Sequence, residues 1–86
     1  RATTTSQSVI DPHTILYNQQ DIFIEEGANI KAAILNAEAG PIYIGRNAVI
    51  EEQAILKGPV AICEGAQVKV GSNLSNGTTI GPHSKV

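Results

Sequence analysis

Aliphatic residues recur at every sixth position over the second half of this chain, and this spacing restricts the fold more than any other feature. The positions that share it are Ile44, Ile50, Leu56, Ile62, Val68, Leu74, Ile80 and Val86. Three residues after each aliphatic position, four of the seven residues are Gly or Asn, which adopt a left-handed backbone at low cost. Each six-residue unit is therefore predicted to be a short strand followed by a corner.

Longer segments realign at a spacing of 18 residues, because residues 40–45 match residues 58–63 and 76–81. One coil earlier, residues 22–28 match residues 42–48 at a spacing of 20. The register that best fits this longer coil pairs Ile34 with Ile55. One corner then loses a residue, and residues 37–39 are predicted to form an inserted excursion on the surface.

Three six-residue units return the chain to its starting side, one strand spacing of about 4.8 Å higher. The pattern predicts an all-β fold, a left-handed parallel β-helix of hexapeptide repeats with 18 residues per coil and about four coils. Ile and Val total 18 against 4 Leu, and Asn and Gly total 14, which favours strands and turns over helices. A β-meander, the alternative, needs regular two-residue hairpin turns that this sequence lacks.

The first part of the chain departs from the repeat. Residues 1–21 are predicted to be an arm or linker, and residues 22–86 the β-helix. Four aliphatic residues of the arm are expected to lie over the first coil as a cap: Val9, Ile10, Ile15 and Leu16. Because Val86 occupies an aliphatic position of a new hexad, we expect a helix truncated at its C-terminal end and a chain that is a fragment of a longer protein. The open last coil would leave Val68, Leu74 and Val86 bare.

Charge and composition argue against several classes of partner. The chain has 86 residues, a net charge of −2 and only 6 basic residues, which disfavours nucleic acid and anionic membranes. Its apolar runs are too short for a transmembrane helix or a signal peptide. The single cysteine, Cys63, permits no internal disulfide. We therefore expect a cytoplasmic protein that binds neither nucleic acid nor membranes.

The register also predicts two columns of charge with alternating sign. Lys31, Glu51 and Lys69 stack in one column. Glu26, Arg46 and Glu64 stack in the other. Cross-strand pairs of this kind specify register and contribute about 0.2–1 kcal/mol each when exposed. A role for Arg46 or Lys69 as a phosphate ligand is the functional alternative.

Several segments resemble the C-terminal β-helix of bacterial sugar-1-phosphate nucleotidyltransferases. They are relatives of the bifunctional N-acetylglucosamine-1-phosphate uridyltransferase and glucosamine-1-phosphate acetyltransferase. The resemblance covers about residues 20–86 and is carried by the segments at residues 40–45, 55–59, 68–71 and 78–86. Hexapeptide repeats are specific for the fold and less so for the reaction, since many acyltransferases share them.

The resemblance implies a homotrimer that binds acyl-CoA in clefts between neighbouring prisms. It implies sugar phosphates and nucleotides as substrates, with Mg²⁺ acting in an N-terminal Rossmann-like domain that this chain does not contain. Acetyl-CoA and Mg²⁺ would thus serve the full-length transferase, and neither is expected to bind to this segment alone. The acetyltransferase residues of the family lie on coils that would follow Val86. No catalytic residue is carried over, and the segment is expected to be inactive by itself.

For three residues with reactive side chains, a structural or solvent-exposed role is the simpler interpretation. His83 could act as a general base, but it stands at a corner position where a solvated turn residue is expected. His13 lies in the arm after Pro12. Cys63 occupies the slot that Gly45 and Gly81 hold in neighbouring coils, where close approach of another subunit would demand a small residue. Two histidines and one cysteine predict no metal site.

Two other functions remain open from the sequence. One is a free-standing hexapeptide acyltransferase, which would need a histidine on a later coil. The other is a purely structural module. An ice-binding surface needs ranks of threonine, whereas the column through Thr79 contains Phe23, Tyr43 and Ala61. A metal hydratase on this fold would need three histidines between subunits, and the chain has two.

Overall fold

The computed structural model describes residues 3–4, 9–75 and 77–85, and these form an all-β solenoid of three parallel sheets. Sheet A contains β1 (Thr3–Thr4), β4 (Ile22–Ile24), β7 (Ile42–Ile44), β10 (Val60–Ile62) and β13 (Thr78–Ile80). Sheet B contains β2 (Val9–Ile10), β5 (Asn29–Ile30), β8 (Val49–Ile50) and β11 (Gln67–Val68). Sheet C contains β3 (Ile15–Tyr17), β6 (Ile34–Asn36), β9 (Ile55–Lys57) and β12 (Asn73–Leu74). A single turn of 3₁₀ helix, Gln19–Asp21, precedes β4.

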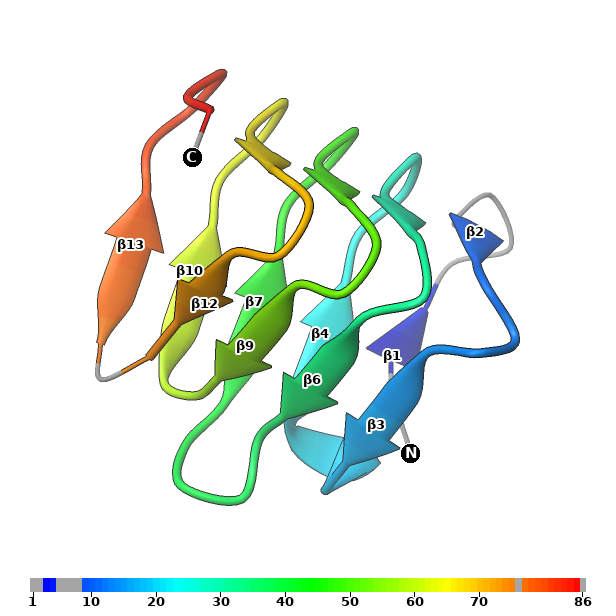
Figure 1. Ribbon diagram of the computed structural model, residues 1–86. Helices are drawn as coiled ribbons and strands as arrows, with labels where there is room; N and C mark the ends of the chain where they lie inside the picture. The colour runs from blue at the N-terminus through cyan, green and yellow to red at the C-terminus, as the bar shows by residue number, and fades with distance from the viewer. Residues whose placement is uncertain (1–2, 5–8, 76, 86) are drawn as a thin grey trace.

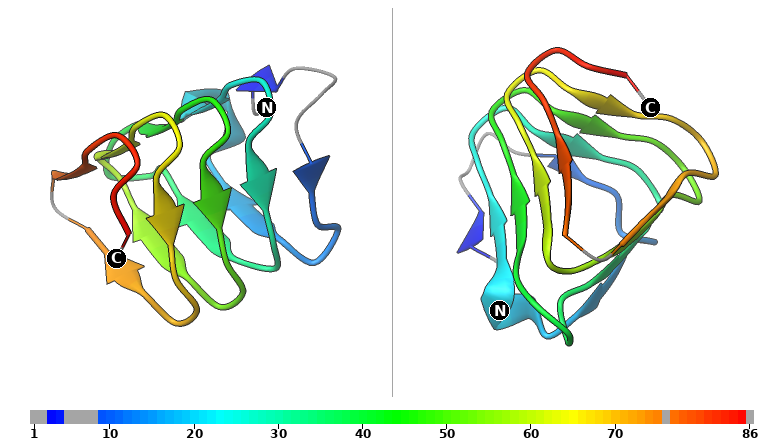
Figure 2. Two further views of the ribbon diagram at one scale, coloured as in Figure 1. Left: turned by 90° about the horizontal axis from the view of Figure 1, so that it is seen from above. Right: turned by 90° about the vertical axis from the view of Figure 1, so that its left-hand side faces the viewer.

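The chain visits sheets A, B and C in turn and advances by one strand spacing per coil (Figure 1). The prism is seen along its axis in the right-hand view of Figure 2, with its C-terminal end toward the viewer. There the chain runs clockwise as it approaches the viewer, so the coil is left-handed. The predicted left-handed parallel β-helix is thus confirmed.

The pairing of strands confirms the predicted register. Ile42 pairs with Val60, and Val60 with Thr78, at the 18-residue spacing. Ile22 pairs with Ile42 across the longer coil. Ile34 pairs with Ile55, as expected from the lost corner residue. All of these pairs are parallel and lie one coil apart.

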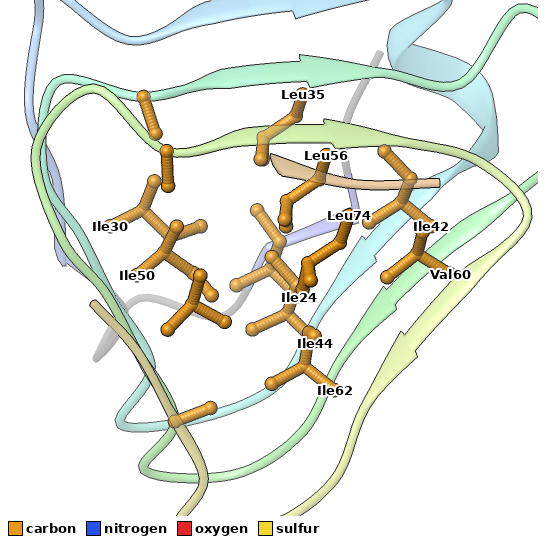
Figure 3. Close-up of a cluster of buried hydrophobic side chains, with 14 of the residues drawn as sticks. Ile24, Ile30, Leu35, Ile42, Ile44, Ile50, Leu56, Val60, Ile62 and Leu74 are labelled. Atoms are coloured by element: carbon orange, nitrogen blue, oxygen red, sulfur yellow. The ribbon is translucent and has the colours of Figure 1, made fainter. Parts of the chain in front are cut away.

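The core is a stack of aliphatic side chains, with alternate residues of each strand pointing inward. Figure 3 shows Ile30 above Ile50, and Leu35, Leu56 and Leu74 in a second stack. Ile22, Ile42 and Ile44 from sheet A are fully buried. Alanines at the corners fill the narrow angles of the triangle, and Ala28, Ala48, Ala54 and Ala66 are also fully buried. Within the described residues, no polar or charged side chain is buried.

The corners use the left-handed backbone conformation that the sequence predicts. Asn47, Gly65, Gly71 and Gly77 all have positive φ. Gln53 and His83 adopt it too, at φ 64° and 58°, although most side chains avoid this region. Pro59 is the exception, because its ring holds φ negative, and its corner contains a cis peptide bond between Gly58 and Pro59.

The N-terminal segment differs from the predicted arm. Its β2 and β3 lie over the next coil as expected, but they do so as regular strands of sheets B and C. Even β1 pairs in parallel with β4. The boundary expected at residue 21 therefore does not separate two kinds of structure, because the backbone ladder continues where the side-chain pattern weakens.

Two further expectations need correction. Ala37 was expected on the surface, yet it is buried, and the exposed excursion consists of Glu38 and Ala39. Val68 and Leu74 were expected to be bare, yet both are buried. Val86, on which the expected truncation depends, lies outside the described residues.

The charge columns have the predicted register but different partners. Lys31, Glu51 and Lys69 each follow an inward residue of sheet B at the same place in successive coils. The carboxylate of Glu51 accepts a hydrogen bond from the side-chain amide of Gln67, and not from either lysine. In the other column the backbone N–H of Arg46 donates to Glu25 at 3.2 Å. An uncharged donor thus partners Glu51, which was expected to pair with lysines, whereas Glu25 lies beside the second predicted column and not in it.

Candidate functional site

The outer face of sheet A carries a small hollow. Its central column contains Phe23, Tyr43, Ala61 and Thr79, as the register predicts. Ala61 is the smallest of these, so a notch opens between Tyr43 and Thr79. The hollow has a volume of about 240 Å³, and its lining residues are Pro41, Tyr43, Pro59, Val60, Ala61, Gly77, Thr78 and Thr79.

Local structure holds both sides of this hollow in place. On one side Pro41 and Pro59 lie where the chain enters β7 and β10, and their rings stiffen the backbone there. On the other side the hydroxyl of Thr78 donates a hydrogen bond to the backbone carbonyl of Ser75 at 2.6 Å. The side chains that remain available to a ligand are the face of Tyr43 and the hydroxyl of Thr79, which is exposed.

A carboxylate orients the aromatic wall. The phenol of Tyr43 is hydrogen-bonded to Glu25, and this bond raises the pKa of Tyr43 above its ordinary value of 10.0. Partial burial and the nearby charges of Glu25, Cys63 and Glu64 raise that pKa further. Tyr43 is nevertheless 39% exposed, so solvent screens much of the effect.

This arrangement suits binding and not catalysis. The hollow can accept a ring-sized apolar group against the face of Tyr43. Its lining contains no nucleophile paired with a base. It also contains no basic side chain, while two carboxylates act on Tyr43, so it does not fit the phosphates of acyl-CoA.

His83 lies at a corner, as predicted from its place in the hexad. It is exposed, and its backbone N–H donates to the carbonyl of Glu64 at 3.0 Å. Its imidazole rests on Gly65 of the preceding coil, where a Cβ atom would overlap the ring. Asn47 covers Gly27 in the same way two coils earlier. This column therefore alternates glycine with a larger corner residue, which is a packing device.

The other predicted candidates are dispersed over the surface. His13 is exposed and lies 3.1 Å from the carboxylate of Asp11. The backbone N–H of His13, 2.8 Å from that carboxylate, is the main reason that the pKa of Asp11 is lowered. Arg46 follows β7 of sheet A and Lys69 follows β11 of sheet B, so they stand at different corners and do not form a joint phosphate site.

Cys63 is partly exposed, and its backbone N–H donates to Ile80 at 2.9 Å. Of the two glycines in its column, Gly45 and Gly81, only Gly45 lacks room for a Cβ atom. A Cβ there would lie 2.8 Å from the backbone nitrogen of Glu64 and 2.9 Å from the carbonyl carbon of Cys63. The close neighbour at Gly45 is the next coil of the same chain, which gives a reason for a small residue there without another subunit.

The sequence did not single out Tyr43 and Glu25 as a pair. The signal was present, because the spacing of 20 residues places Glu25 one coil below Gly45, beside Tyr43. Over the described ranges, no set of three or more His, Cys, Asp or Glu side chains is placed to hold a metal ion. The same ranges contain no helix with the length and apolar character needed to cross a membrane.

Comparison of the chain with protein-family models, with curated proteins and with solved structures finds no significant match.

Proposed function

We propose that this chain is the hexapeptide-repeat β-helix of a bacterial, cytoplasmic sugar-1-phosphate nucleotidyltransferase, in which it serves as the scaffold for assembly into a trimer. The observation that carries this proposal is the left-handed β-helix with the 18-residue coil that the resembling segments imply. Acyl transfer from acetyl-CoA, with catalytic residues on other coils, is a second activity of the proposed parent.

The dispersion of reactive side chains supports a scaffold role for these coils. His13, Cys63 and His83 lie at separate places on the prism, and the hollow on sheet A contains none of them. In the proposed parent, the reacting groups are supplied by other coils and by the nucleotidyltransferase domain. Mg²⁺ would be held by the nucleotidyltransferase domain, since the described residues offer no acidic cluster for it.

The test is an assay of the protein that contains this chain. Pyrophosphate release is measured with nucleoside triphosphates, Mg²⁺ and a panel of hexose and hexosamine 1-phosphates, and thiol release is measured with acetyl-CoA and the corresponding amino sugars. We expect pyrophosphate release that requires both the sugar phosphate and Mg²⁺. Thiol release alone would instead support a free-standing acyltransferase. Neither product over the whole panel would leave a structural module and contradict the proposal.

A further inference from the structure

The outer face of sheet C carries a column of isoleucines. Ile15 pairs with Ile34, Ile34 with Ile55 and Ile55 with Asn73, so three isoleucines line up on successive coils and the exposed Asn73 ends the column. Ile15 is 45% exposed, and the other two are half-buried. Figure 1 shows β3, β6 and β9 side by side. The outward positions of sheet B are more polar, since Asn29 and Gln67 flank Val49 there.

Parallel sheets in proteins are generally covered on both faces, and their strands then contain consecutive apolar residues. Three of the four strands of sheet C have this character, with an outward isoleucine next to an inward leucine in β3, β6 and β9, whereas β12 has Asn73 outward. Only the inward side is covered within this chain, because Leu35 and Leu56 are fully buried whereas the isoleucines are not.

Charged side chains of opposite sign flank this column on its two sides. In the coil of Ile34, Lys31 precedes the strand and Glu38 follows it. In the coil of Ile55, Glu52 precedes the strand and Lys57 ends it. The signs thus reverse from side to side within a coil and from one coil to the next.

We propose that sheet C is a self-association surface, on which a second copy of this chain sits with its axis parallel and its coils at the same height. The proposal deepens the assembly role proposed above and rests on it. Rotation about an axis parallel to the prism preserves the height of every coil and exchanges the two flanks. It therefore brings Lys31 toward Glu38 of the partner subunit and Glu52 toward Lys57 of the partner subunit. A two-fold pair and a three-fold ring both obey this rule.

The charges also oppose the other simple arrangement. An antiparallel pair centred on Ile34 would place Lys31 against Lys31 of the partner subunit and Glu38 against Glu38 of the partner subunit. Like charges across an interface are unfavourable and suppress the wrong register. An apolar centre with a charged rim is the usual composition of protein interfaces.

The first experiment measures the mass of the full chain by sedimentation equilibrium. We expect the wild-type chain to be oligomeric, and Ile34→Lys to raise its dissociation constant by more than about a hundredfold, since a charge would enter the apolar centre. Val49→Lys is the matched control, because Val49 is a half-buried outward residue of sheet B. It should leave the mass unchanged. Far-ultraviolet circular dichroism verifies that both variants remain folded.

The second experiment tests the charge rule without touching the core. Glu52→Lys and Lys57→Glu, each alone, place like charges on facing flanks and should weaken association about tenfold. Combined in one chain, the two changes again place opposite charges on facing flanks, in a two-fold pair and in a three-fold ring alike, and this double variant should associate like the wild-type chain.

Three outcomes would overturn the inference: a monomeric wild-type chain, equal effects of Ile34→Lys and Val49→Lys, or no recovery in the double variant. A wild-type oligomer that is insensitive to Ile34→Lys leaves the scaffold role intact and removes only the assignment to sheet C. The pyrophosphate assay is independent of all three outcomes, so failure of the nucleotidyltransferase proposal is recognised separately.

Discussion

Single residues at the corners decide whether successive coils can stack. Gln53 and His83 adopt positive φ although neither is Gly or Asn, because the closed coil imposes the corner geometry on whichever residue occupies it. Gly45 has a different reason to be glycine. Its backbone is approached by the next coil so closely that a Cβ atom would meet backbone atoms of Cys63 and Glu64.

Gly45→Ala is therefore expected to lower the free energy of unfolding by about 1–3 kcal/mol, since backbone atoms cannot yield as a flexible side chain can. The control is Gly81→Ala in the same column two coils later, where the nearest atom to a Cβ is Ser84 Oγ at 3.6 Å. That change should be close to neutral or slightly stabilising. Urea unfolding measures both variants, and equal losses would show that the close approach at Gly45 has no energetic consequence.

The hydrogen bond between Tyr43 and Glu25 predicts a phenol that titrates late. Glu25→Gln removes the carboxylate charge and should lower the pKa of Tyr43 toward 10.0. The measurement is absorbance at 295 nm in a Tyr17→Phe background, so that Tyr43 is the one tyrosine observed.

Because the folded state holds the proton more tightly, the associated stability is present below the unfolded pKa and is lost as pH rises above it. Glu25→Gln should therefore lessen the fall in stability on the alkaline side. An unchanged titration midpoint in that variant would count against control of the phenol by Glu25.

Within each strand, whether a side chain points inward or outward decides how much it contributes to stability. Ile55 and Leu56 are adjacent, yet Leu56 is fully buried and Ile55 is half-buried on the outer face. This alternation makes each three-residue strand stabilising only through its inward residues. It also leaves the outward residues free to specify contacts outside the prism.

Leu56→Ala should cost about 2–5 kcal/mol, because it opens a cavity between Leu35 and Leu74 in their stack. Ile55→Ala is the matched change and should cost clearly less in a monomer, since solvent already reaches that side chain. Thermal unfolding at a protein concentration low enough to prevent association compares the two. Similar costs would contradict the assigned strand direction.

The charge columns give a prediction for neighbouring coils. Glu51→Lys would make a column of three cations, with the new lysine between Lys31 and Lys69. It would also remove the hydrogen bond from Gln67. We expect a lower melting temperature in low salt, by an amount equivalent to about 1 kcal/mol, and partial recovery in high salt. An unchanged melting temperature in low salt would argue against this register.

For the whole molecule, stability depends on stacking, because each coil buries its aliphatic side chains only against its neighbours. A second copy on sheet C would likewise bury the outward isoleucines of that sheet. Mass action then requires the melting temperature of the wild-type chain to rise with protein concentration. The melting temperature of Ile34→Lys should not rise in this way, whereas that of Val49→Lys should; calorimetry over a hundredfold range of concentration compares them.

The sequence by itself determined the length of the coil, its left-handed sense and its register. A period of six imposes a strand and a corner on every unit, so Ile42, Val60 and Thr78 could be aligned without coordinates. The column that forms the hollow on sheet A could be read in the same way, from Phe23 to Thr79. Repetition makes such contacts predictable because each residue meets its counterpart one coil away.

Only the tertiary structure decided the features that depend on completed coils. The first 21 residues lack the side-chain pattern, yet β2 and β3 join the sheets, because backbone hydrogen bonds extend a ladder whatever the side chains are. Ala37 is buried and Glu38 begins the excursion, since the path around a longer corner follows packing and not period. The partners of Glu51 and Tyr43 are diagonal or uncharged neighbours, and side-chain reach in three dimensions selects them.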